Sequence, residues 1–445
     1  MINDWGEAKP PVPFALTAQS MTDSQNEQQH FTRAVVELGG HQDVVVTQAI
    51  FNTQGTKILE RGNTLHQELY QRLLQHKLSA PLENSLRGSK SVSAETLKRS
   101  AEEVMLDIPF FGRMAADDKT RKLLLDMMET VPLPDPMAFQ LTVARDARPE
   151  IYQHLVRTAL VAAWLARTPV ISRYDVQMAT AGGLLHNIGM LHIDPLLLRP
   201  EHVLNREQRR QLYSHPLLST MLLERHHQYS KDVVRAVGEH HECLDGSGYP
   251  RNLGGDAISL LGKILSLAQV VAAMFAPGRN VPEMRLSVLL RMNTHRYDNA
   301  MSMQVVALLK PQRDAMGTDA GHMADPVAVL REIDRLLCLW PVAAGQVAIS
   351  PARQETLGLI GRHAGQIRRS LAGVGAVPEQ LDQLGDEALD DTVLTELTLL
   401  TREAVWQLRT LGRQARRRWQ EQQDEPLPST LEQWLSDVDA VEDRA

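Results

Sequence analysis

The chain has 445 residues, of which 43% are hydrophobic and 23% charged, and its formal net charge is −7 at pH 7. This length allows two or three domains with their own cores, and the mild negative charge argues against a nucleic-acid coat protein. The two cysteines, Cys243 and Cys338, have no CxxC partner, which argues against a disulfide scaffold and a cysteine-zinc site. Because we find neither a signal-peptide pattern nor a run of about 18 apolar residues, we expect a cytoplasmic protein that does not span a membrane.

The first third of the chain predicts three segments. Low aromatic content, with abundant Leu, Ala, Arg and Gln, favours a mainly α fold throughout. Residues 1–30 lack periodicity and predict a disordered leader, and residues 91–134 predict a helical linker that ends in a corner at Pro132–Pro136. Residues 31–90 predict a small α+β module, with a strand at Asp43–Thr47, a hairpin of Ala49–Phe51 and Lys57–Glu60, and a helix over Leu65–Lys77 capped by Thr64.

The middle of the chain, residues 135–315, predicts a helical domain. Apolar residues recur every three to four positions, which is typical of helices with one buried face. The predicted helices begin at Glu150 and continue with Asp175–Leu185, Glu207–His227, Val233–His241, Ile258–Met274, 283–292 and 301–310.

Residues 316–445 predict a carboxy-terminal helical region with an acidic tail, after a turn-rich separator at Met316–Asp325. The predicted helices span residues 326–339, 352–371 and 391–420. The last helix carries Arg413, Arg416, Arg417 and Arg418, and the acidic residues are Glu421, Asp424, Glu425 and Asp437–Asp443. We interpret this basic run as a solvated helix face that answers the acidic tail, in preference to a nucleic-acid contact.

The stretch His240–Pro250 is the most polar site-like segment of the chain. It places two imidazoles, two carboxylates and a Gly/Pro-rich turn within eleven residues, which predicts a metal or phosphate site. Other predicted helices add His154, His186 and His215, and Glu150 lies one helical turn before His154. Adjacent helical side chains diverge by about 100°, so His240 and His241 are expected to serve two metals, or to be one ligand and one supporting group. With sixteen histidines in the chain, unrelated core or surface histidines are an equal alternative.

The ordered motifs H…HN-IG, HP and HHE-x-x-DG-x-GYP resemble the HD-GYP branch of the HD superfamily. The resemblance covers residues 135–312 and continues through Asn252–Ile258. It implies an all-helical HD-type domain of bacterial proteins that hydrolyse cyclic di-GMP at a bi- or trinuclear iron or manganese centre. The family's metal-ligand pattern maps onto Glu150, His154, His186, His215, His240 and His241.

Four positions depart from the family pattern. The aspartates expected after His186 and in the helix that follows the GYP motif are Asn187 and Gln269. The lysine after the HD-IG element is Met190, and Arg279 is the sole remnant of a phosphate-contacting element. An amide offers one neutral oxygen where a carboxylate offers two and a negative charge, so a bridged metal pair would lose charge compensation.

These departures favour a degenerate domain in a bacterial cytoplasmic signalling protein, which acts by protein interaction or by sensing a nucleotide or metal linked to cyclic di-GMP. The alternative is an active metal-dependent cyclic di-GMP phosphodiesterase with an altered site. In either case one or two iron or manganese ions are the expected cofactors, and a homodimer is one expected state. The family also implies that a diguanylate cyclase or another signalling protein binds the loop made by Asp245, Gly246, Gly248, Tyr249 and Pro250.

Overall fold

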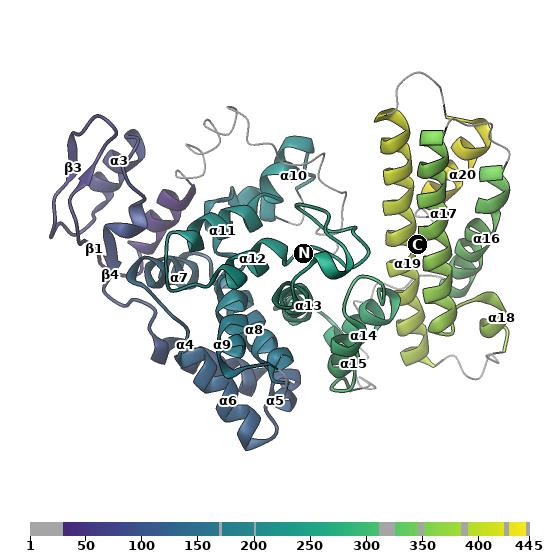
Figure 1. Ribbon diagram of the computed structural model, residues 1–445, viewed down its shortest axis with the longest axis horizontal. Helices are drawn as coiled ribbons and strands as arrows, with labels where there is room; N and C mark the ends of the chain where they lie inside the picture. Colours follow the sequence, from purple (N-terminus) through teal and green to yellow (C-terminus); the bar gives the residue numbers. More distant parts are fainter. Residues whose placement is uncertain are drawn as a thin grey trace. The chain divides into compact units, whose positions relative to one another are not determined.

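The structure is a computed structural model that describes residues 30–168, 171–199, 202–310, 325–345, 351–383, 390–421 and 427–441. These residues are mostly helical, with two small two-stranded sheets near the amino end (Figure 1), which confirms the mainly α fold. They form two compact units, the first ending at Ala276 and the second beginning at Pro277. The predicted leader and the turn-rich separator lie almost entirely outside the described residues.

The amino-terminal module begins with a helix over residues 30–38 and has the predicted hairpin. Its further elements are β1 (Val44–Val46), β2 (Ile50–Phe51), β3 (Lys57–Leu59), α3 (Gln67–Gln75), the 3₁₀ helix η1 (Leu82–Asn84) and β4 (Leu86–Gly88). β1 pairs with β4 and β2 with β3, both antiparallel. The prediction that Thr64 caps the following helix is wrong, because Thr64 forms a β-bridge with Val45 and α3 begins later, after His66.

Side-chain contacts attach this module to the helices of the first unit. The Gln42 amide donates to Asp146 Oδ2 at 2.7 Å. Phe31 stacks on His192, with ring centroids 4.8 Å apart and planes 11° apart. His192 ends a 3₁₀ turn, η2 (Ile188–His192), that directly follows Asn187. The module therefore packs against the segment that carries one of the departures from the family pattern.

The helices before residue 135 pack against the rest of the first unit, and the linker role expected for residues 91–134 stays a prediction. They are α4 (Ala94–Asp107), α5 (Pro109–Met114) and α6 (Asp118–Glu129), followed by α7 (Asp135–Ala147). α4 and α6 contact each other and α8 (Pro149–Ala166), and their apolar faces are buried at Leu97, Leu124 and Met127. The predicted corner at Pro132–Pro136 is confirmed between α6 and α7.

The core of the first unit lies where α8 packs against α9 (Arg173–Leu185) and α13 (Leu260–Met274). α8 and α9 approach closely because Gly183, which has no side chain, lies in their interface. A Cβ on Gly183 would stand 2.8 Å from Ala159 Cα, closer than van der Waals contact allows. This packing fixes the end of α9, where His186 lies.

The helix predicted over Glu207–His227 is two helices, α10 (Arg206–Leu212) and α11 (His215–Glu224). Pro216 has no amide proton and stands in the first turn of α11, where none is needed, so the chain breaks before it. The break places His215 at a helix start. α12 (Lys231–Glu239) packs against α11 and α13, and the short 3₁₀ turns η3 (Pro195–Leu198) and η4 (Gly255–Ala257) complete the unit.

The second unit is helical. It contains α14 (Pro282–Met292), α15 (Asn299–Val306), α16 (Pro326–Gly345), α17 (Pro351–Gly373), α18 (Pro378–Leu381), α19 (Asp391–Glu421) and α20 (Ser429–Ala440). α17 and α19 run side by side, and α14 contacts both (Figure 1). Compact packing thus groups α14 and α15 with the carboxy-terminal helices, and the domain boundaries expected from sequence stay a prediction.

Part of the acidic tail forms a packed helix, α20, for which the sequence analysis has no predicted helix. α20 buries Leu431, Trp434, Leu435 and Val438 on one face. Asp439 of α20 forms an ion pair with two nitrogens of Arg416, at 2.6 and 3.2 Å.

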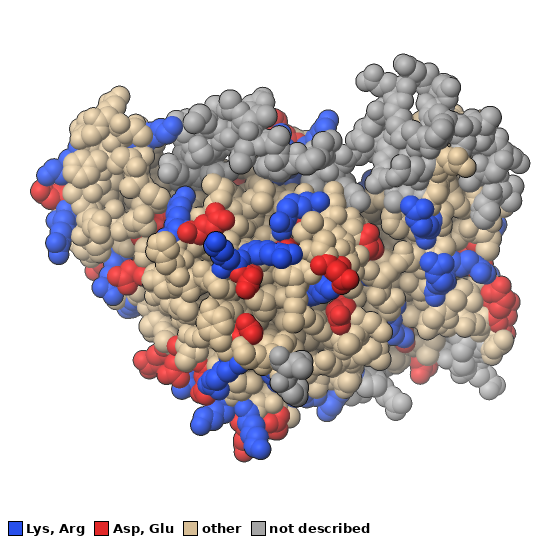
Figure 2. Space-filling view, viewed as in Figure 1, with Lys and Arg blue, Asp and Glu red and all other residues tan. Residues whose placement is uncertain are grey.

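Acidic and basic side chains are interspersed on the face drawn in Figure 2. None of the described helices combines the length and the apolarity needed to cross a bilayer.

Candidate metal centre

Three histidines stand at helix ends and share one hydrogen-bonding arrangement. His186 follows α9, His215 begins α11 and His240 follows α12. In each, Nδ1 lies 2.6–2.8 Å from the backbone carbonyl three residues earlier, on Gly183, Leu212 and Val237. A carbonyl only accepts, so Nδ1 carries the proton and Nε2 keeps its lone pair. Helix-end geometry thus prepares three Nε2 atoms as metal ligands.

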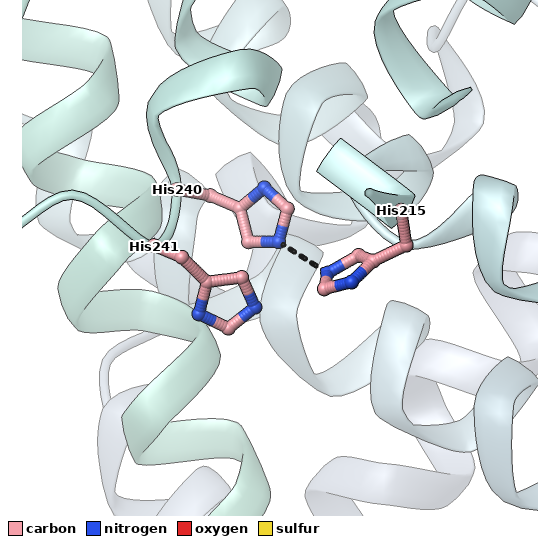
Figure 3. Close-up of side chains that lie close together, drawn as sticks. All are labelled: His215, His240 and His241. Carbon is pink, nitrogen blue, oxygen red and sulfur yellow. Dashed lines mark hydrogen bonds between the residues drawn. The ribbon is translucent and has the colours of Figure 1, made fainter. Parts of the chain in front are cut away.

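These Nε2 atoms point at other imidazoles. His215 Nε2 and His240 Nε2 are 3.2 Å apart, and so are His154 Nε2 and His186 Nε2 (Figure 3 shows the first pair). With both Nδ1 atoms protonated, the facing Nε2 atoms of His215 and His240 offer two lone pairs and no proton between them. A metal ion resolves this conflict, since nitrogens about 2.0 Å from one tetrahedral ion stand about 3.3 Å apart.

His241 joins this pair. One donor nitrogen each from His215, His240 and His241 lies within 4.8 Å of the others, and all three rings converge (Figure 3). The prediction that His240 and His241 serve two metals, or act as one ligand and one supporting group, stays a prediction beside this geometry. α12 ends at Glu239, so the 100° helical divergence does not apply to residues beyond it.

Burial keeps the histidines neutral. It lowers the pKa of His154 to about 3 and that of His240 to about 4. It also lowers the pKa values of His186, His215 and His241 well below their usual range. Neutral imidazole is the form that binds a metal, so at pH 7 no proton has to be displaced from the donor nitrogens.

Carboxylates do not join this donor group in the part of the chain that the structure describes, where it consists of histidines alone. Asn187 directly follows His186, and its Oδ1 is buried without a hydrogen-bond partner among the described residues. Gln269 is half-buried on α13, and Glu150 is exposed in the first turn of α8. The donors fit a single nitrogen-ligated ion better than a carboxylate-bridged pair.

Met190 and Arg279 are the other two positions that depart from the family pattern. Met190 is buried in η2. Arg279 belongs to the second unit, where its charge acts on Arg285, and its predicted phosphate contact stays a prediction.

Glu242 holds the GYP loop, residues 245–250, against the histidines. This role was not predicted from the sequence. The carboxylate of Glu242 accepts from the amides of Arg251 (2.7 Å) and Leu253 (2.9 Å), and the Tyr249 amide donates to His241 O (3.1 Å). Glu242 is fully buried, so its loop contacts explain its place in the HHE motif. The sequence held one signal for this role, namely a glutamate directly after two histidines and just before a glycine-rich turn.

Half of the predicted partner-binding loop is buried. Gly248, Tyr249 and Pro250 are buried, whereas Asp245, Gly246 and Ser247 are partly exposed. Gly246 adopts φ +72°, a backbone conformation that favours glycine. A partner protein that approaches this loop in the described conformation would contact its first half.

Replacing Gly248 by alanine should destabilise the loop. An added Cβ would stand 2.4 Å from both Glu242 Cα and His241 O, and backbone atoms cannot yield cheaply. We expect the free energy of unfolding to fall by about 1–3 kcal/mol in urea denaturation. Gly373→Ala is the matched control, because no atom stands near its added Cβ. Equal stabilities of the two variants would contradict the close approach.

Comparisons with known proteins agree with this site. Residues 101–301 match the model of the HD domain family. A 3′3′-cGAMP-specific phosphodiesterase 3 of Vibrio cholerae is 30% identical over 157 residues, covering 35% of this chain and 34% of the relative. The histidine motifs and these matches together decide the family. Residues 101–301 form an HD domain that carries the motifs of the HD-GYP type.

Two other relatives also match this chain over part of their length. The 3′3′-cGAMP-specific phosphodiesterase 1 of V. cholerae is 33% identical over 28% of each chain. A cyclic di-GMP phosphodiesterase of Pseudomonas aeruginosa is 34% identical over 28% of this chain and 30% of the relative. The matches span about a third of the relatives' lengths, so the HD-GYP resemblance concerns a domain and not the whole chain.

Proposed function

We propose that this chain is a bacterial cytoplasmic signalling protein whose HD-GYP domain holds one transition metal ion on histidines and has lost most or all hydrolytic activity. It acts by protein interaction or by sensing a cyclic dinucleotide or the metal. The observation that carries the proposal is the all-histidine donor group made by His215, His240 and His241. Asn187 and Gln269 stand where the family pattern has aspartates, so the charge that would hold a second dication is missing.

The residues divide the work at such a site. His215, His240 and His241 would hold the ion, with His154 and His186 as the adjacent pair. When bound, the ion supplies Lewis acidity and a positive charge for a phosphate group. The carbonyls bonded to Nδ1 of His215 and of His240 keep the Nε2 lone pairs of these two rings directed inward. Glu242 fixes the loop that carries Tyr249.

An active phosphodiesterase is the second candidate. The five histidines of the family pattern lie together, and the relatives are named as phosphodiesterases of cyclic di-GMP or cGAMP. Metal analysis of purified protein, with chromatography of cyclic di-GMP and 3′3′-cGAMP incubated with it and Mn²⁺ or Fe²⁺, separates the two. We expect about one ion per chain and intact dinucleotides. Turnover that disappears in His240→Ala would establish the enzyme instead.

A further inference from the structure

Tyr249 of the GYP motif is enclosed between two aromatic rings. Its ring stacks on His241, with centroids 4.5 Å apart and planes 15° apart. It also stacks on Tyr213, again at 4.5 Å and with planes 23° apart. Two near-parallel rings at this distance cannot share one face, so Tyr249 is the middle layer of a three-ring stack. Its exposed fraction is 6%, so the stack is part of the interior.

The stack connects two members of the histidine triad, which consists of His215, His240 and His241. His241 is its first layer, and the last layer, Tyr213, stands two residues before His215 at the end of α10. The His215 ring also lies 5.0 Å from His241 and 6.3 Å from Tyr249, nearly perpendicular to both. The plane of Tyr249 therefore controls how the His241 ring is presented to His215.

The hydroxyl of Tyr249 has no evident part in this arrangement. It is buried and has no hydrogen-bond partner among the described residues. Burial raises its pKa well above the usual range, so the group stays protonated and neutral. What Tyr249 contributes to the triad is then the flat face of its ring, which phenylalanine shares and leucine lacks.

We propose that Tyr249 is a positioning residue that fixes the ring of His241 relative to His215 and so sets the metal affinity of the triad. The inference rests on the proposed function in one respect, namely that the triad binds a metal. It gives the tyrosine of the motif a role in this chain that does not depend on catalysis or on a docked partner.

Cobalt titration of the full chain tests the proposal, because Co²⁺ reports both its affinity and its ligand geometry in visible absorption. Tyr249→Phe should bind Co²⁺ within about twofold of the wild type, with an unchanged spectrum. Tyr249→Leu should bind about 10- to 100-fold more weakly, with a shifted spectrum, as expected when a residue that orients a ligand is lost. In a His241→Ala background, Tyr249→Leu should have no further effect, because the ring that it positions is gone.

The controls separate positioning from stability. Tyr229→Leu removes another buried tyrosine of the same unit, whose hydroxyl donates to Pro132 O, and should lower stability while keeping the Co²⁺ affinity. Tyr213→Leu removes the outer ring only and should weaken binding about threefold or more; it serves if Tyr249→Leu does not fold.

Each contrary outcome points to one error. Wild-type affinity and spectrum in folded Tyr249→Leu, or in Tyr213→Leu should the former not fold, would overturn the positioning role. Equal weakening in Tyr249→Phe and Tyr249→Leu would show that the hydroxyl acts instead of the ring. A wild-type chain that binds no Co²⁺ would overturn the proposed function itself, whatever the variants do.

Discussion

The double variant Asn187→Asp/Gln269→Asp should take up a second metal ion and gain phosphodiesterase activity. Each substitution restores a carboxylate that the HD-GYP pattern expects, so two negative charges are added at positions that the pattern assigns to metal ligands. We expect the metal content to rise from about one to about two Mn²⁺ or Fe²⁺ ions per chain, because these harder ions prefer oxygen ligands.

The Oδ1 atom of Asn187 is buried, so the substitution Asn187→Asp tests whether a cation lies near this position. This oxygen has no hydrogen-bond partner among the described residues, although it lies next to His186. A carboxylate there would be costly without a cation and favourable with one. The variant should therefore unfold at a lower temperature than the wild type without metal, and regain stability when Mn²⁺ is added.

Matched charge changes at exposed positions give the control. Asn299→Asp/Gln228→Asp adds the same two charges on exposed residues and should change neither metal content nor melting temperature by much. Metal analysis and thermal unfolding measure both outcomes, and chromatography detects dinucleotide cleavage. If the site variant holds no more metal than this control, the alignment of Asn187 and Gln269 with the family aspartates is wrong.

The metal-free protein should lose stability steeply as the pH falls below 6.5. Five neighbouring histidines have pKa values lowered by burial, with His154 at about 3 and His240 at about 4. In the unfolded chain a histidine takes up its proton near pH 6.5. Between these pH values the unfolded state binds more protons than the folded state.

The sign of the effect follows from this difference. The free energy of unfolding falls with falling pH, by about 1.4 kcal/mol per pH unit for each histidine that stays neutral when folded. The loss begins near pH 6.5 and ends for each histidine at its folded pKa, which is about 4 for His240. Above pH 6.5 these histidines add no pH dependence.

Urea denaturation between pH 7.5 and 4.5, with and without Zn²⁺, measures this dependence. Zn²⁺ should protect the folded state at pH 7.5 and keep most of this effect at pH 4.5, because the folded histidines are still largely neutral while those of the unfolded chain are protonated and bind Zn²⁺ poorly. His240→Gln should reduce the slope, whereas His227→Gln, which changes an exposed histidine, should leave it unchanged. A stability that does not vary over this range would contradict the buried neutral histidines.

Much of the fold followed from local rules. Pro132 and Pro134 lie between α6 and α7, and Pro136 stands in the first turn of α7, because proline cannot occupy a helix interior. The hairpin of β2 and β3 followed from its alternating apolar residues and turn. The helix cap at Thr64 was predicted wrongly and the helix α20 was not predicted, since a β-bridge to Val45 and the packing of Trp434 depend on distant parts of the chain.

The sequence alone determined which chemical groups the site contains. The order of the histidine motifs indicates the family, and Asn187 and Gln269 mark the missing carboxylates. Only the tertiary structure decided which nitrogen faces which. His215 and His240 meet through Nε2 because separate helix ends fix their Nδ1 protons, and His241 joins them because α12 stops one residue before His240. Ring orientation depends on chain direction at a helix end and on stacking partners such as Tyr249, which no spacing in the sequence records.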